Sequence, residues 1–339
     1  MSTDIIIPVW NLYEYTRQCI ESVYAHTPEP FTLIIVDNAS DEPTKGYLEA
    51  LARQKSNVKL LRNEQNLGFP KAVNRGIAES SGEFALLLNN DTLATTGWLQ
   101  EMIKVAQINK QIGIVNANSN TLGAKPKAAQ SIEELALELK SHSGEYTELA
   151  WATGFCMLIK REVIAQIGTL DEAYGMGNFE DADFCKRALA KGYLSVCASA
   201  AYVYHRERQS FMKFKEFSAD FTRLRETFYA KWGRMERILY VLGASSNPAI
   251  EKITRQALQA ARQGNVVWMF CKGQQSAGWQ HHSNLYVYAL APQFFNLVSL
   301  WRIIKKKKKF RKIYVDDLAF KKKLISLKLL HKAEVLDAE

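Results

Sequence analysis

The chain has 339 residues, of which 47% are hydrophobic and 23% charged, a composition that excludes an intrinsically disordered protein and allows one large domain with an appendage. Its net charge of +9 is concentrated in residues 302–339, where 13 Lys and Arg stand against 5 Asp and Glu, so the rest of the chain is nearly neutral. The five cysteines are scattered and never form a C-x-x-C pair, which excludes a disulfide framework or a zinc ribbon and fits a reducing cytoplasm.

The first apolar stretch, residues 4–9, follows the initial residues directly. A signal peptide has a basic start, a long apolar segment and a small-residue cleavage site, and none of these precedes residue 4. We therefore expect a cytoplasmic protein.

Apolar runs and helical patterns alternate through residues 1–120, which is typical of repeated βα units. The predicted strands are residues 4–9, 31–37, 58–62, 84–88 and 112–116, and the predicted helices are residues 13–25, 44–54, 71–79 and 98–109. These elements predict an α/β fold with a doubly wound, mostly parallel sheet and flanking helices. Because such sheets bind ligands beyond the carboxyl ends of their strands, the polar residues that follow the strands indicate one shared cleft.

The second half of the chain is less regular. Residues 120–148 predict a surface loop with a short helix, residues 177–183 begin another helix, and residues 195–205 form one or two strands. We expect a catalytic domain over residues 1–217, a mainly helical accessory region over 218–301, and a basic tail over 302–339. Residues 264–270 are compatible with a strand or a buried helix, and the apolar residues 285–304 indicate an interfacial or core segment rather than a transmembrane one.

The basic tail has two interpretations. Lys305 to Lys309, with the lysines at 321–323, form a local positive cluster that would contact an anionic membrane surface. A solvated tail with no partner is the alternative, and the pattern does not decide between them.

Two turns follow the first two strands. Pro8, Trp10 and Asn11 end the first strand without the G-x-G-x-x-G of a dinucleotide fold, which disfavours a dehydrogenase. Asp37 ends the second strand, where an acidic residue accepts hydrogen bonds from a base or ribose. On its own, Asp37 is better explained as an ordinary turn residue or N-cap.

Two further segments suggest a phosphate and metal site. Residues 66–76 place Asn66, Gly68 and Lys71 at the start of a helix, where Gly68 would allow a close backbone approach and the helix amides with Lys71 would meet a phosphate. A capped helix without a ligand is the alternative. The run Asn89-Asn90-Asp91 ends an apolar strand, and one carboxylate suffices for a divalent cation when a diphosphate supplies other ligands.

These four segments, in their order and spacing, resemble the inverting family 2 glycosyltransferases of the GT-A fold, and the likeness runs from about residue 4 to residue 205. The family's metal motif is usually Asp-x-Asp, so this chain retains only its second carboxylate, Asp91. The resemblance implies a nucleoside-diphosphate sugar (UDP-, dTDP- or GDP-linked) as donor and Mn²⁺ or Mg²⁺ as cofactor. The implied nucleotide-sugar residues are Pro8, Trp10, Asn11, Asp37, Asn66, Gly68, Lys71 and Asn90.

The same likeness covers the acceptor side. Thr153 and Gly154 resemble the family's acceptor strand, and residues 177–183 resemble its Glu-Asp motif, which implies that Asp181 is the general base and Glu180 its neighbour. His205 matches a position at which members place a histidine near the metal. The implied acceptor is a glycan or lipid-linked hydroxyl in cell-surface polysaccharide assembly, with the enzyme peripheral on the inner face of the membrane.

Each of these residues also has a simpler explanation. Asn178 and Asp181 would form a capping box, Asp183 would pair with Arg187 four residues later, and a single histidine is more often a packed residue than a ligand. A nucleotidylyltransferase is disfavoured because no glycine-rich basic loop follows the first strand. The alternative function is a non-catalytic protein that binds RNA or anionic lipid through its basic tail, although no nucleic acid is expected as a partner.

Overall fold

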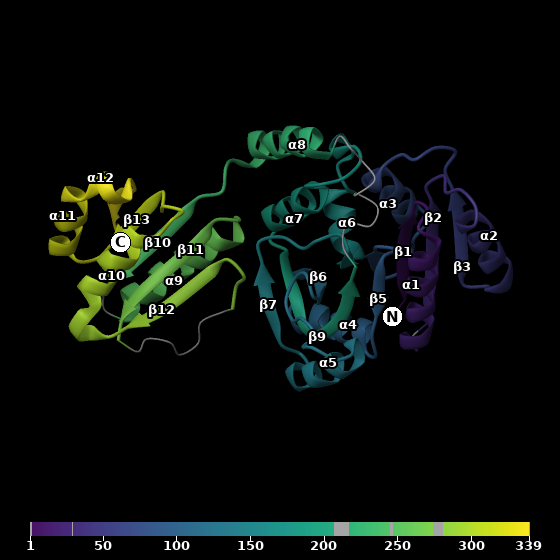
Figure 1. Ribbon diagram of the computed structural model, residues 1–339, viewed down its shortest axis with the longest axis horizontal. Helices are drawn as coiled ribbons and strands as arrows, with labels where there is room; N and C mark the ends of the chain where they lie inside the picture. Colours follow the sequence, from purple (N-terminus) through teal and green to yellow (C-terminus); the bar gives the residue numbers. More distant parts are fainter. Residues whose placement is uncertain (1, 29, 207–216, 245–246, 274–280, 339) are drawn as a thin grey trace. The chain divides into compact units, whose positions relative to one another are not determined.

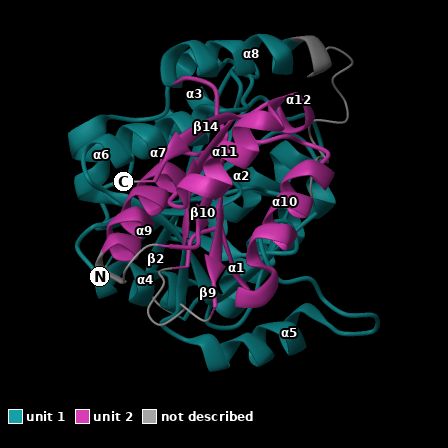
Figure 2. Ribbon diagram, turned by 90° about the vertical axis from the view of Figure 1, so that its left-hand side faces the viewer, with its two compact units in different colours: residues 1–147, 151–232 teal, residues 148–150, 233–339 magenta. Residues whose placement is uncertain are grey.

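The computed structural model of the chain describes residues 2–28, 30–206, 217–244, 247–273 and 281–338. The chain divides into two compact units (Figure 2): residues 1–147 with 151–232 form unit 1, and residues 148–150 with 233–339 form unit 2. Each unit is built on its own β-sheet (Figure 1).

Unit 1 contains a nine-stranded mixed sheet in the order β3-β2-β1-β4-β8-β6-β9-β5, with β7 paired to β9. Strands β3, β2, β1 and β4 are mutually parallel, and β6 is parallel to β9, whereas β8 and β5 run antiparallel to their neighbours. The strands are β1 (Thr3–Val9), β2 (Phe31–Asp37), β3 (Val58–Arg62), β4 (Phe84–Leu88), β5 (Thr92–Ala94), β6 (Ile112–Asn118), β7 (Tyr146–Leu149), β8 (Cys156–Lys160) and β9 (Leu194–His205). The expected α/β sheet is confirmed.

Helices cover both faces of this sheet, as the alternation of buried residues along β1 requires. Ile5 and Ile7 pack in one core cluster with α1, α2 and α4, whereas Ile6 packs in a second cluster with α3, α6 and α7. The unit 1 helices are α1 (Tyr13–His26), α2 (Thr44–Gln54), α3 (Phe69–Ala78), α4 (Trp98–Ile108), α5 (Ile132–Leu139), α6 (Arg161–Ile167), α7 (Glu180–Ala190) and α8 (Phe217–Trp232), with short 3-10 helices at Lys140–His142 and Glu172–Tyr174. This three-layer arrangement leaves the carboxyl ends of β1, β2, β4 and β9 as the edge where the predicted site residues stand.

Unit 2 is a second α/β unit, which the sequence did not lead us to predict. Its five strands are all parallel in the order β12-β11-β10-β13-β14. The strands are β10 (Arg237–Leu242), β11 (Val266–Lys272), β12 (Leu285–Leu290), β13 (Lys312–Val315) and β14 (Glu334–Asp337), and the helices are α9 (Asn247–Arg262), α10 (Phe295–Lys305), α11 (Leu318–Ser326) and α12 (Lys328–His331), with a 3-10 turn at Pro292–Phe294.

The structure therefore differs from the expected domain boundaries. The unit boundary follows Trp232 rather than residue 217, because α8 belongs to unit 1. Residues 218–301 contain the expected helices but also three strands, and residues 302–339 are not a tail. Phe310, Ile313 and Val315 in that stretch are buried in the unit 2 core. Among the described residues, no helix combines the length and hydrophobicity needed to cross a bilayer.

Candidate active site

Asp37 and the asparagine after it organise the turns on the donor side. One oxygen of Asp37 accepts a bond from the Ser40 amide at 2.9 Å, and the other pairs with Arg62. Asp37 is only 1% exposed, so its carboxylate braces this turn. The Asn38 side chain donates to Asn66 Oδ1 at 2.7 Å and so joins the turn after β2 to the segment that precedes α3.

The turn after β1 is held to the same edge. The Asn11 backbone amide donates to Ser40 Oγ at 2.8 Å, and the Asn11 side-chain oxygen accepts from the Asp41 amide. Pro8 and Trp10 are half-buried beside it. Asn11, Asp37 and Asn66, three of the predicted nucleotide residues, therefore stand on neighbouring segments that are bonded to each other.

Gly68 serves a purpose different from the expected one. Its φ of 84° is open to glycine, and a Cβ there would lie 2.3 Å from the carbonyl oxygen of Gly175. The first α3 amide, that of Phe69, donates to the Met176 carbonyl at 3.3 Å. The backbone that approaches Gly68 is thus the chain's own loop before the Glu-Asp pair, while Lys71 is exposed one turn later.

Asp91 and His205 form the candidate metal pair. His205 Nε2 lies 3.2 Å from Asp91 Oδ1, and both side chains are largely buried. Strand pairing brings them together, because β5 begins at Thr92 and Thr92 pairs with His205 at the end of β9. Asn90 points elsewhere: its side chain donates to Thr16 of α1 at 2.9 Å.

A carboxylate oxygen beside an imidazole nitrogen suits a divalent transition ion such as Mn²⁺, which accepts both donor types. The described residues hold no cluster of three or more His, Cys, Asp or Glu side chains around such an ion. Further ligands would have to come from water or from a substrate phosphate, as is common for this class of site.

Asp181 stands at the start of α7 and is held from a different element. Its carboxylate accepts from the Gly154 amide at 3.1 Å and from the Ala182 amide at 2.7 Å. Phe155, next to Gly154, stacks on His205 with ring centroids 5.0 Å apart. A short chain of contacts therefore connects Asp181, through Gly154, Phe155 and His205, to Asp91.

Burial raises the pKa of both Glu180 and Asp181. Glu180 is 6% exposed, one of its carboxylate oxygens has no hydrogen-bond partner, and burial together with the Asp181 charge raises its pKa to about 8. Burial also raises the pKa of Asp181, but the amides of Gly154 and Ala182 oppose that shift. At neutral pH Glu180 keeps its proton, and the two backbone amides favour the ionised form of Asp181.

The capping-box explanation of this segment is wrong. Phe179 is the N-cap of α7 and makes no side-chain cap bond, while the side-chain amide of Asn178 donates to the Gly177 carbonyl. Asn178 and Phe179 both have positive φ, 87° and 70°, a conformation that non-glycine residues adopt at a cost and that concentrates at functional sites.

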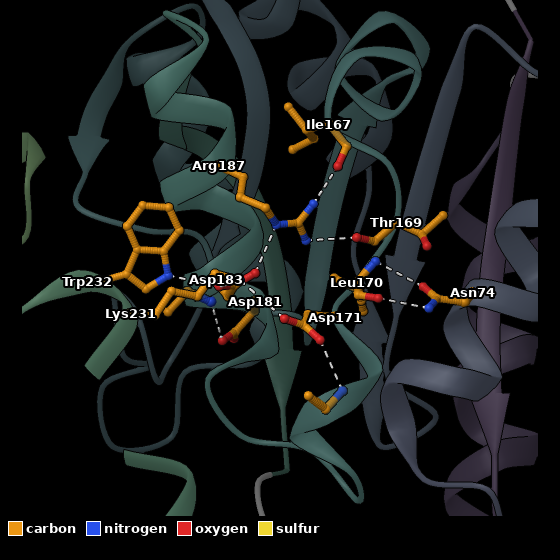
Figure 3. Close-up of polar contacts among 12 residues, drawn as sticks. Asn74, Ile167, Thr169, Leu170, Asp171, Asp181, Asp183, Arg187, Lys231 and Trp232 are labelled. Carbon is orange, nitrogen blue, oxygen red and sulfur yellow. Dashed lines mark hydrogen bonds and ion pairs between the residues drawn. The ribbon is translucent and has the colours of Figure 1, made fainter. Parts of the chain in front are cut away.

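Asp183 is structural, as its spacing from Arg187 suggested. It is fully buried and pairs with Arg187 Nε at 2.9 Å and with Lys231 Nζ at 2.7 Å, and it accepts from the Trp232 indole at 2.8 Å. Figure 3 shows Arg187 also reaching the carbonyls of Ile167 and Thr169. This network ties α7 to the end of α8 and fixes the helix on which Asp181 stands.

Two asparagines that position the candidate site were not predicted from the sequence. The Asn116 side chain exchanges two hydrogen bonds with the Thr153 backbone, at 2.8 and 2.6 Å, and so sets the loop that binds Asp181. Asn120 does the same for His205, at 2.9 and 2.8 Å. Nothing distinguishes these side chains from other strand-end asparagines, because the signal lies in the pairing of distant segments.

Comparisons with known proteins agree with this geometry. The family described as Glycosyl transferase family 2 matches residues 4–168. The uncharacterised protein y4gI of Sinorhizobium fredii is 30% identical over 61% of this chain, which spans about a quarter (24%) of that protein's length. The N-acetylglucosaminyl-diphospho-decaprenol L-rhamnosyltransferase of Mycobacterium tuberculosis is 27% identical over 61% of this chain and 78% of its own.

Solved structures show the same fold. The mannosyltransferase PcManGT of Pyrobaculum calidifontis, in complex with GDP-Man and Mn²⁺, superposes with a TM-score of 0.52 at 16% identity, over 77% of this chain and 68% of its own. GalNAc-T7 with UDP, GalNAc and Mn²⁺ gives a TM-score of 0.51 at 14% identity, over 68% of this chain and 50% of its own. Residues 4–168 of unit 1 therefore belong to glycosyl transferase family 2, and unit 1 has the GT-A fold of these structures.

Proposed function

We propose that the chain is an inverting glycosyltransferase that moves a sugar from a nucleoside-diphosphate sugar to an acceptor hydroxyl. The observation that carries the proposal is the position of Asp181: its carboxylate is half-buried, accepts a hydrogen bond from Gly154 and is connected by packing to the Asp91–His205 pair. A base and a candidate metal pair on the same edge of the sheet are what a single-displacement transfer requires.

In the proposed reaction, Asp181 accepts the proton of the acceptor hydroxyl while that oxygen forms a bond to the anomeric carbon. The bond from the anomeric carbon to the diphosphate oxygen breaks, and its electron pair leaves with the nucleoside diphosphate. Asp91 and His205 would hold a divalent cation, Mn²⁺ or Mg²⁺, which supplies positive charge beside the leaving group when bound. Neutral Glu180 leaves Asp181 as the only proton acceptor of the pair.

We assign the donor to the turns after β1, β2 and β3. Pro8, Trp10 and Asn11 would contact the nucleoside, with Asp37 bracing their turn, and Asn66 and Lys71 would lie near the ribose and phosphates. Thr153 and Gly154 would face the acceptor. The named activities of the relatives and neighbours, which involve rhamnosyl transfer, GDP-mannose and UDP, support a UDP-, dTDP- or GDP-linked donor and a lipid-linked or glycan acceptor.

We also assign the reaction to the cytoplasm. All five cysteines are unpaired and buried, which fits a reducing compartment.

A panel of UDP-, dTDP- and GDP-sugars, each with Mn²⁺ or Mg²⁺, tests the proposal. We expect release of one nucleoside diphosphate from at least one donor, and Asp181→Asn should lower this turnover at least 100-fold because it removes the proton acceptor. Glu162→Gln, which changes an exposed carboxylate on α6, is the matched control and should keep the wild-type rate.

An unchanged rate in Asp181→Asn would overturn the assignment of the base. Silence of the wild-type chain across the panel, together with tight and salt-sensitive RNA binding, would favour the non-catalytic alternative.

A further inference from the structure

Helix α10 of unit 2 carries apolar side chains on two opposite sides. Phe295, Ser299 and Ile303 recur every four residues and are buried against the sheet. On the outward side, Leu297 and Trp301 are 66% and 59% exposed, and Phe294, just before the helix, is 61% exposed. A helix that is apolar all round is normally buried. The outward side of α10 is therefore suited to an apolar environment other than this chain's core.

The positive charge of unit 2 adjoins these residues. Residues 292–315 contain eight Lys and Arg and no Asp or Glu. Lys305 is exposed and follows Leu297 and Trp301 at the same four-residue interval, which places it on the outward side of α10. Lys307 and Lys308 are exposed immediately after the helix ends.

An open pocket with a cavity volume of about 260 Å³ lies beside this side of α10 and is lined by residues of the helix, β11 and β12. Trp301 and Tyr288 line it together with Arg302 and Lys306. Arg302 lies 4.9 Å from the centroid of the Tyr288 ring, and Lys306 lies 4.4 Å from that of Trp268.

The two cations of this pocket, Arg302 and Lys306, repel each other. In the part of the chain that the structure describes, neither Arg302 nor Lys306 forms an ion pair with a carboxylate. Burial, and then repulsion from Arg237 and Arg302, lowers the pKa of Lys306. An anion in the pocket would relieve this repulsion.

We propose that this α10 face, formed by Phe294, Leu297, Trp301 and Lys305 with the adjoining pocket, docks on an anionic phospholipid bilayer. The exposed apolar side chains would enter the interfacial region, the pocket would take a lipid phosphate, and Lys305 to Lys308 would lie along the headgroups. With 11 residues, α10 is about 16 Å long, against about 30 Å of hydrocarbon, so it lies on the bilayer and does not cross it. A nucleic acid would satisfy the lysines but not the exposed Leu297 and Phe294.

Flotation of the full chain with vesicles tests this inference without any donor, so its result is independent of the transfer reaction. We expect binding to vesicles of 40% phosphatidylglycerol in phosphatidylcholine and none to phosphatidylcholine alone. The variants Leu297→Ser/Trp301→Ser and Lys305→Gln/Lys307→Gln/Lys308→Gln should each weaken binding at least tenfold. All five side chains are exposed, so both variants should fold.

Leu137→Ser is the matched control, because Leu137 is a 64% exposed leucine on α5 of unit 1, and it should bind as the wild type does. The proposal is wrong if the wild-type chain does not float with anionic vesicles at 0.15 M salt. It is also wrong if the apolar variant binds as tightly as the wild type, which would show a purely ionic contact, or if 10 mM inorganic phosphate releases the bound chain at constant ionic strength, which would show a pocket for a soluble anion.

Discussion

At the scale of single residues, the candidate site depends on backbone that ordinary side chains avoid. Asn11 and Leu12 before α1, Ala39 after β2, and Asn178 and Phe179 before α7 all have positive φ. Each lies where a strand or loop gives way to a helix at the site edge. These turns adopt strained backbone and thereby direct their amides and side chains toward one edge of the sheet. The hydrogen bond between Asn38 and Asn66 helps to keep the turns in place.

Gly68 tests whether the donor-side turn and the Glu-Asp loop are one packed structure. We expect Gly68→Ala to lower the free energy of unfolding by at least ~1 kcal/mol more than Gly168→Ala. Both glycines have a positive φ and a nearly extended ψ, but a Cβ at Gly168 meets nothing within 4 Å, whereas one at Gly68 meets the Gly175 carbonyl. Urea denaturation measures both, and equal losses would show that the loop contact at Gly68 contributes nothing.

The raised pKa of Glu180 should make the free energy of unfolding depend on pH. Its pKa rises from 4.5 to about 8 on folding, so between these values the folded chain binds more protons than the unfolded chain, and the free energy of unfolding falls as pH rises. Glu180→Gln keeps the shape without the charge and should be stabilised relative to wild type at pH 8.5, by on the order of 2 kcal/mol, but not at pH 4.5. Melting temperatures of both proteins at the two pH values decide this. A difference that does not change with pH would show that Glu180 is not the titrating group.

At the scale of elements, α7 carries the Glu180–Asp181 pair that we propose to be catalytic, and α8 holds α7. Asp183 is the junction, because it pairs with Arg187 of its own helix and with Lys231 at the end of α8, and Lys231 also reaches Asp171 at 3.2 Å. Figure 3 shows these contacts converging on the start of α7. The four side chains of this junction, those of Asp171, Asp183, Arg187 and Lys231, thus lie outside the segment that the family match covers, which ends at residue 168.

Removing this junction should be costly. Asp183→Ala leaves two cations beside a buried apolar site, and we expect a loss of about 3 kcal/mol in the free energy of unfolding. Asp220→Ala breaks the exposed Asp220–Arg223 pair, whose side chains are 54% and 62% exposed, and should cost less than about 1 kcal/mol. Chemical denaturation of the two variants provides the comparison, and similar losses would contradict the role given to Asp183.

The elements that could be predicted are those with a strong period. The predicted ranges 31–37, 58–62, 84–88 and 44–54 coincide with β2, β3, β4 and α2, because each is a continuous apolar run or a helical repeat bounded by turn residues. Helix α3 begins at Phe69 rather than at residue 71, since Gly68 supplies the turn. Asn116 and Asn120 could not be assigned, because their function depends on which strands become neighbours in the sheet.

At the scale of the whole molecule, the chain holds two α/β units of different sheet topology. Unit 1 has a mixed sheet with the candidate site at one edge, and unit 2 has an all-parallel sheet. The second sheet escaped prediction because runs such as residues 237–242 and 266–272 are apolar throughout, and periodicity cannot separate a buried parallel strand from a buried helix. The lysines at 305–309 suggested a tail, yet Lys305 ends α10 and the others lie in the connection from α10 to β13, within unit 2.

The central claim is that Asp91, His205 and Asp181 share one sugar-nucleotide site in unit 1. Its most direct test is a crystal structure of the full chain with Mn²⁺ and UDP, dTDP or GDP, in which anomalous scattering locates the manganese. We predict a manganese peak bonded to Asp91 and His205, with the diphosphate beside it and the Asp181 carboxylate facing the same space. A nucleotide bound elsewhere on the chain, with no metal at Asp91, would contradict the account.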